Sequence, residues 1–93
     1  MTAELLLDER HVLSDTAFAE LVIWQVPIPL RGSAHEYGYR LALVVDGRCV
    51  LRYDNEADKG DHRDVDNREF AYSFETPDKL LVDFWTAVDD WLK

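Results

Sequence analysis

The segment from Tyr53 to Asn67, YDNEADKGDHRDVDN, gathers many of the side chains in this sequence that could carry out chemistry. Its histidine, His62, is flanked by the cations Lys59 and Arg63. A histidine changes charge near neutral pH and can move protons. Cationic side chains, and the backbone N–H groups around a glycine, can hold a phosphate. The pattern therefore predicts a site that cleaves a phosphodiester bond without a metal ion.

The predicted site has a catalytic set and a substrate-binding set. The residues expected to carry or orient the reaction are His62, Tyr53, Lys59, Arg63 and Asp61. The residues expected to contact the substrate are Tyr39, Arg40, Asn55, Gly60 and His35. His35 is also a second candidate proton carrier, because it lies just before the strand expected to carry Tyr39 and Arg40. No cofactor is expected.

Two other interpretations of this segment remain open. Asp61, His62, Asp64 and Asp66 offer oxygen and imidazole ligands, and an oxygen-rich set suits Mg²⁺ or Mn²⁺, so a metal-dependent nuclease is one alternative. Aspartates also gather in surface turns, where their side chains bond to the backbone. In the second alternative His62 is an exposed loop histidine and the segment is a solvated connection.

The charge of the chain limits its partners. The net charge is −9, which argues against general nucleic-acid binding because phosphate backbones require lysine and arginine. Residues 40–68 nevertheless hold six of the ten basic residues, while the flanking segments are acidic. We therefore expect no direct DNA binding, contact with RNA only through the central segment, and a basic partner protein.

The composition predicts a cytoplasmic protein with a single domain over residues 1–93. Cys49 is the only cysteine, so no internal disulfide can form. The sequence has no apolar run near the ~20 residues that a membrane helix needs. Its N-terminus lacks the basic region of a signal peptide.

The elements that position these residues can be placed from the sequence pattern. Residues 4–13 predict either a short hairpin turning at Asp8-Glu9-Arg10 or one bent strand. Residues 17–26 lack clean alternation and allow a helix, but their β-branched and aromatic types favour a strand buried on both faces. Alternating apolar residues on either side of Asp46-Gly47 predict a β-hairpin over residues 39–53.

The second half of the chain predicts a loop, a strand and a helix. The loop over residues 54–68 is longer than the usual hairpin connection of about two to five residues, which is why we expect it to be functional. Phe70, Tyr72 and Phe74 alternate as in a strand with one aromatic face. Thr76 suits the N-cap and Pro77 the first turn of a helix. The expected fold is α+β, a mostly antiparallel sheet of four to six strands with the C-terminal helix packed on one face.

Several segments resemble the TumE-type proteins of prokaryotic toxin–antitoxin systems. They are LLLDERHVL, AELVIWQVP, HEYGYRLALVVDG, RYDNEADKGDHR and F-x-T-P-D-K-L-L-x-D-F-W, and the most specific parts are YDN and KGDHR. The residues that match the family's motif are Tyr53, Asp54, Asn55, Gly60, Asp61, His62 and the pair Tyr39-Arg40. The resemblance implies a toxin encoded beside a winged-helix or helix-turn-helix DNA-binding antitoxin.

The sequence departs from the expected motif at one position. Where the resemblance implies a second histidine, G-D-H-x-H, this chain has Asp64. If the two histidines form an acid/base or metal-binding couple, the change to Asp64 would weaken or abolish activity. Alternatively, His35 would act in place of the missing second histidine.

The leading hypothesis is a type II toxin with ribonuclease-like activity, acting on RNA through the YDN…KGDHR segment. The main alternative is a non-catalytic interaction module that binds the DNA-binding antitoxin. A homodimer, formed through an edge strand or through Trp85 and Trp91, is compatible with both.

Overall fold

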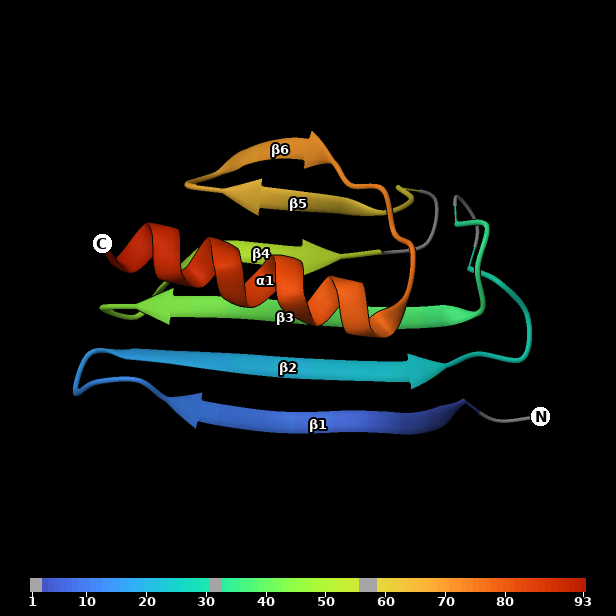
Figure 1. Ribbon diagram of the computed structural model, residues 1–93, viewed down its shortest axis with the longest axis horizontal. Coiled ribbons are helices and arrows are strands. Elements are labelled where there is room, and N and C mark those ends of the chain that lie inside the picture. The colour runs from blue at the N-terminus through green and yellow to red at the C-terminus, as the bar shows by residue number, and fades with distance from the viewer. Residues whose placement is uncertain (1–2, 31–32, 56–58) are drawn as a thin grey trace.

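The described residues form a six-stranded antiparallel sheet with one helix packed along one of its faces. The computed structural model describes residues 3–30, 33–55 and 59–93. The elements are β1 (Glu4–Val12), β2 (Ala17–Gln25), β3 (Tyr37–Val45), β4 (Arg48–Asp54), β5 (His62–Val65), β6 (Arg68–Ala71) and α1 (Pro77–Leu92). Each strand pairs with the next along the chain, so the order in the sheet is the order in the sequence (Figure 1). The α+β prediction is confirmed.

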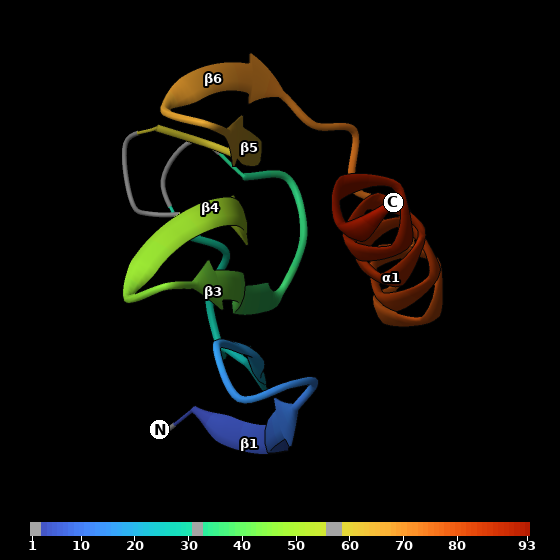
Figure 2. The ribbon, with the colours of Figure 1, turned by 90° about the vertical axis from the view of Figure 1, so that its left-hand side faces the viewer.

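Helix α1 lies against one face of the sheet, here called the helix face, and leaves the other, the open face, uncovered (Figure 2). It begins as predicted, with Thr76 accepting a hydrogen bond from the backbone N–H of Lys79. Its buried side chains Leu80, Phe84 and Val88 pack on residues of β2, β3 and β4. Burying each large apolar side chain contributes about 1.5–3 kcal/mol, and this packing fixes the helix on the sheet. Within the described ranges, no helix is long and apolar enough to cross a membrane.

The predicted β-hairpin over residues 39–53 is confirmed as strands β3 and β4. Asp46 and Gly47 connect them with φ angles of 52° and 76°. Positive φ at both central positions is what a two-residue type I′ turn requires, and the Asp-Gly pair accepts it. The hairpin forms the centre of the sheet.

Strand β1 settles the two alternatives for the N-terminal segment. Residues 4–12 form one strand with an irregularity between Leu5 and Leu7, so the hairpin alternative is wrong. Asp8, Glu9 and Arg10 pair with β2 instead of turning, and their side chains stay exposed because β1 is an edge strand. The strand expected next is confirmed as β2, but only one of its faces is fully buried while the other is half-buried.

The long loop expected over residues 54–68 is wrong, because much of it forms strand. Residues 62–65 are β5, and Asp66 and Asn67 turn the chain into β6 with φ angles of 49° and 68°. Asp and Asn tolerate the left-handed region, so they form a tight turn without glycine. Residues 56–58 of the segment lie outside the described residues.

The aromatic strand expected at residues 70–74 ends early. Strand β6 stops at Ala71, so Tyr72 and Phe74 lie on the connection to α1. Tyr72 packs edge-on against Tyr53, and Phe74 stacks on His35. These ring contacts, with a hydrogen bond of 3.2 Å from the backbone N–H of Tyr72 to the carbonyl of Asp61, hold this part of the chain.

Candidate functional site

The register of β3 to β6 places two rows of polar residues side by side on the open face. The rows are Arg40–Asp54–His62 and Arg52–Asp64–Glu69. Successive residues of a strand point to opposite faces, so Tyr53 and Arg63 belong to the helix face. We call Arg52, His62, Asp64 and Glu69 the open-face group.

His62 is the buried member of the open-face group, with 3% of its surface exposed. Its Nδ1 lies 3.0 Å from the carbonyl oxygen of Gly60. A carbonyl oxygen only accepts, so Nδ1 carries a hydrogen, and in the neutral ring Nε2 then carries a lone pair. Nε2 is buried and has no hydrogen-bond partner among the described residues. The alternative of an exposed loop histidine is therefore wrong.

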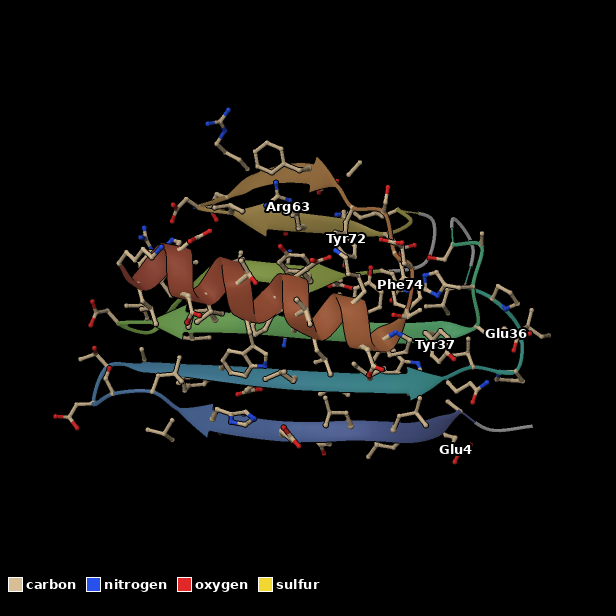
Figure 3. The ribbon with its side chains drawn as sticks, in the orientation of Figure 1. Glu4, Glu36, Tyr37, Arg63, Tyr72 and Phe74 are labelled. Atoms are coloured by element: carbon tan, nitrogen blue, oxygen red, sulfur yellow. The ribbon has the colours of Figure 1, made fainter. Side chains whose placement is uncertain are left out.

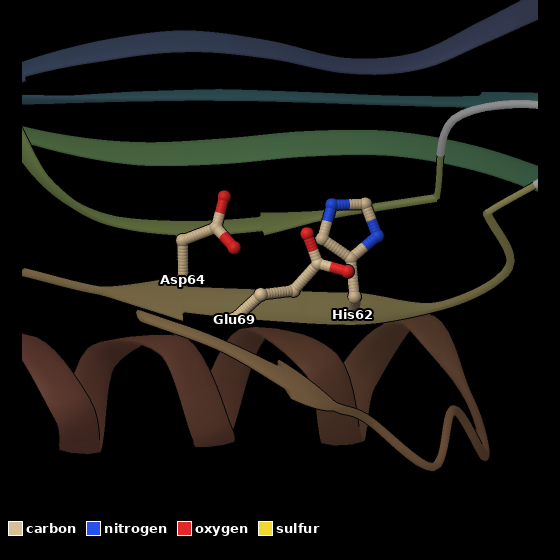
Figure 4. A group of neighbouring side chains, drawn as sticks. All are labelled: His62, Asp64 and Glu69. Atoms are coloured by element: carbon tan, nitrogen blue, oxygen red, sulfur yellow. The ribbon is translucent and has the colours of Figure 1, made fainter. Parts of the chain in front are cut away.

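Two carboxylates lie beside the His62 ring. Single ligand atoms of His62, Asp64 and Glu69 all lie within 4.8 Å of one another. In Figure 4 the Glu69 carboxylate lies between Asp64 and the imidazole ring. Arg52 donates a hydrogen bond of 2.5 Å to Asp64, which raises the pKa of its guanidinium, so Arg52 stays charged. The Lys59 ammonium lies 3.9 Å from Glu69.

Arg52, Asp64 and Glu69 of the open-face group border a hollow that a ligand could enter. The hollow has a volume of about 280 Å³, and its lining includes Arg52, Asp64, Glu69 and the free Cys49. The charged lining suits a polar ligand better than an apolar one.

A second set of polar residues, which we call the Asp61 cluster, lies at the end of the sheet where α1 begins. It consists of Ser33, His35, Tyr39, Asn55 and Asp61. Asp61 accepts hydrogen bonds from Ser33 Oγ at 2.7 Å, from His35 Nε2 at 2.6 Å and from the Tyr39 hydroxyl at 2.7 Å. Asn55 accepts from the backbone N–H of Tyr39 at 2.9 Å and donates to the carbonyl of Tyr37 at 2.7 Å.

The polar side chains of the Asp61 cluster form hydrogen bonds with one another and with the adjacent backbone. His35 uses Nε2 for Asp61, accepts the backbone N–H of Tyr37 at Nδ1, and stacks on Phe74 at 3.9 Å. Figure 3 places Tyr37 and Phe74 at this end of the sheet. Burial and the hydrogen bond to Asp61 raise the pKa of Tyr39 far above its ordinary value, so its hydroxyl stays a donor. We conclude that the cluster fastens β3 to the start of β5.

The predicted catalytic residues do not converge on one spot. Tyr53 and Arg63 line a hollow of about 310 Å³ on the helix face, together with Tyr72 and Asp83. Figure 3 shows Arg63 and Tyr72 alongside α1. Burial raises the pKa of Tyr53, and the adjacent Arg63 opposes this rise.

The other sequence-predicted residues are divided among these regions. Asp61, Asn55, Tyr39 and His35 form the Asp61 cluster, and the buried Gly60 supplies the carbonyl that orients His62. The side chains of Lys59 and Arg40 are exposed, and Arg40 belongs to the first row of the open face.

The residues predicted as metal ligands do not all lie together. Asp64 lies with His62, but Asp61 is held in its own cluster and Asp66 is exposed in the turn. Sequence reasoning missed Glu69. The alternation of His62 and Asp64, followed by a turn at Asp66-Asn67, would have placed Glu69 opposite Asp64.

Comparison with known proteins identifies a family. The family model described as Toxin TumE matches residues 2–92. No curated protein and no solved structure matches the chain. Because the match spans nearly the whole sequence, the chain belongs to the TumE toxin family, which implies an antitoxin partner.

Proposed function

We propose that this protein is the toxin of a type II toxin–antitoxin pair and that it acts on RNA through the open-face group. The observation that carries the proposal is the buried lone pair of His62 Nε2, without a hydrogen-bond partner among the described residues and beside two carboxylates. Membership of the toxin family supports the cellular role. The hollow beside Arg52, Asp64 and Glu69 supplies room for part of a nucleotide.

The chemistry of phosphodiester cleavage fits these groups. The attacking oxygen must lose a proton, the leaving oxygen must gain one, and positive charge must face the phosphate. The lone pair of His62 can accept a proton or bind a cation. Arg40 and Arg52, on neighbouring strands of the same face, supply positive charge.

The antitoxin partner in this proposal is a helix-turn-helix DNA-binding protein. A protein of that kind carries a basic surface, and the net charge of −9 on this chain would speed their encounter. The same charge supports the expectation that the toxin itself does not bind DNA.

The test is growth after induced expression without an antitoxin, together with the integrity of cellular RNA. Wild type is expected to arrest growth and degrade RNA, whereas His62→Gln and Glu69→Gln are expected to do neither. Glu36→Gln is the matched control for Glu69→Gln, because it removes the same charge from an exposed residue that directly precedes β3 and lies outside the open-face group, and it should act as wild type. Variants of His62 and Glu69 that are as toxic as wild type would refute the proposed site. Normal growth of a host that expresses the wild-type protein would refute the proposed role as a toxin.

A second candidate function is a non-catalytic module that docks on the antitoxin. The favouring observation is the edge strand β1, where Leu5 is 60% and Val12 is 75% exposed. An exposed apolar edge invites pairing with another chain. Co-purification with the antitoxin, with RNA left intact in cells that express the free protein, would favour this candidate.

A further inference from the structure

We propose that the open-face group binds a divalent transition-metal ion through His62 Nε2 and the carboxylates of Asp64 and Glu69. The role of such an ion in RNA chemistry rests on the proposed function. Its binding, however, is a property of the isolated chain and can be measured without any activity.

The first argument is the orientation of His62. A metal-binding histidine usually donates its second ring N–H to a carbonyl or carboxylate, which fixes the tautomer and aims the free nitrogen at the ion. Here Nδ1 donates to the Gly60 carbonyl at 3.0 Å, and Nε2 keeps its lone pair. A buried polar atom without a partner costs about 1–3 kcal/mol, and coordination to a metal ion would offset this cost.

The second argument is the distance between the ligand atoms. With bonds of about 2.0–2.2 Å, two ligand atoms of a tetrahedral site lie roughly 3.3–3.6 Å apart. The ligand atoms of His62, Asp64 and Glu69 lie within 4.8 Å of one another, so a movement of the side chains toward one another would bring them onto one ion. Glu69 can make this movement because its side chain is 55% exposed.

The types of the ligands narrow the choice of ion. Imidazole suits zinc and other transition metals, whereas carboxylates suit manganese and magnesium. One imidazole with two carboxylates therefore favours Mn²⁺ or Zn²⁺ over Mg²⁺. Three protein ligands also leave positions open for water or for a phosphate oxygen.

Arg52 orients one of the proposed ligands, and carboxylates compensate its own positive charge. Arg52 donates to Oδ2 of Asp64 at 2.5 Å, which holds the carboxylate in place and leaves Oδ1 for the ion. The guanidinium also lies 3.9 Å from Asp54. Asp54 and Asp64 thus face Arg52, and Glu69 faces Lys59. Arg40 pairs with Asp54 across β3 and β4, so the carboxylates and cations of this region balance one another.

A bound cation would also explain how so acidic a protein meets RNA. The net charge of −9 repels a polyanion, and this repulsion is long-ranged at low salt. A divalent ion held between the carboxylates and a phosphate reverses the local charge at the point of contact. The ion would therefore bridge protein and substrate.

The experiment is a Mn²⁺ titration of the full-length ¹⁵N-labelled chain, made by cell-free synthesis so that toxicity does not limit the yield. Substoichiometric Mn²⁺ is expected to broaden the amide signals of His62, Asp64 and Glu69 before those of Asp89 and Asp90 on the acidic helix. Calorimetry with Mn²⁺ and Zn²⁺ should show binding weakened by about tenfold or more in Glu69→Gln, as for the loss of a supporting group or ligand. Glu36→Gln should bind as wild type.

Two results would overturn the metal site. One is broadening that reaches Asp89 and Asp90 as early as His62. The other is equal affinity in Glu69→Gln and Glu36→Gln. Because Glu69 is exposed, its variant keeps the test valid even if a change at the buried His62 disturbs folding. Selective Mn²⁺ binding without toxicity would refute only the proposed function, and His62-dependent toxicity without selective binding would refute only the metal site.

Discussion

The Asp61 cluster and the open-face group each contain a histidine and an aspartate, yet they differ in how their polar atoms are used. In the Asp61 cluster one carboxylate accepts from a serine, a histidine and a tyrosine, and both nitrogens of His35 are occupied. In the open-face group the buried Nε2 of His62 has no hydrogen-bond partner in the described part of the chain. Satisfied polar networks rigidify a fold, whereas an unsatisfied buried group calls for a ligand. The two regions should therefore respond differently to the same mutation.

The largest effect is expected for Asp61→Asn compared with Asp64→Asn. The first change removes a charged acceptor from three donors, and the loss in the free energy of unfolding should be about 2–3 kcal/mol. The second disturbs a partly buried ion pair with Arg52, whose own side chain is 32% exposed, and should cost only about 1 kcal/mol. Urea denaturation of both variants measures the difference. Equal losses would remove the distinction between a structural and a reactive region.

The next effect is expected for Tyr39→Phe, which deletes one donor to Asp61 and leaves the ring in place. We expect the free energy of unfolding to fall by about 1–2 kcal/mol because a buried hydrogen bond to a charged acceptor is lost. Tyr37→Phe is the matched control, since it removes the hydroxyl of a half-buried ring of the same strand. Thermal denaturation should place the Tyr39 variant below the control by several degrees, at about 4–8 °C per kcal/mol for a chain of this size. Coincident melting curves would contradict the role of the hydroxyl.

The converse effect is expected for Glu69→Gln, which should change activity and leave stability nearly unaltered. The side chain is 55% exposed and its ion pair with Lys59 is 3.9 Å long, so we expect a change within about 0.5 kcal/mol in the free energy of unfolding. Growth arrest, in contrast, should be lost. A variant that keeps toxicity but unfolds more easily would assign Glu69 to the scaffold.

Local signals in the sequence predicted the hairpin and the helix. Asp46-Gly47 supplies the two left-handed positions of its turn, and Thr76-Pro77 supplies the cap and first turn of α1. The turn at Asp66-Asn67 was missed because it lacks glycine, so β5 was taken for loop. Local chemistry can identify an element only where the residues leave few other conformations open.

The sequence identified most of the candidate residues but did not show which of their side chains lie together in the fold. His62 and Arg63 are neighbours in the sequence, and in a loop they could act together. As parts of a strand they face opposite sides of the sheet, so Arg63 lies beside Tyr53 while His62 lies beside Glu69. Which residues meet thus depended on strand pairing, and a single sequence specifies pairing only through turns that are recognised.

Among the tyrosine–aspartate hydrogen bonds, the smaller effect is expected at Asp83, which, like Asp61, accepts a tyrosine hydrogen bond of 2.7 Å but lies closer to solvent. Burial alone would raise its pKa, but hydrogen bonds from Lys79 and Tyr72 outweigh this and hold the pKa below its ordinary value. A depressed carboxyl pKa stabilises the fold above the unfolded-state pKa of about 3.9, and this contribution is lost as the pH falls through the folded-state pKa. Asp83→Asn should therefore lower the free energy of unfolding by less than about 1 kcal/mol near pH 7, since the pair is partly exposed. The difference from wild type should shrink in denaturation series toward pH ~2, where the wild-type carboxyl is protonated as well.

Asp89→Asn, an exposed change of equal charge on the same helix, controls for net charge. If Asp83→Asn cost as much as Asp61→Asn, burial would not be what separates the two tyrosine–aspartate bonds.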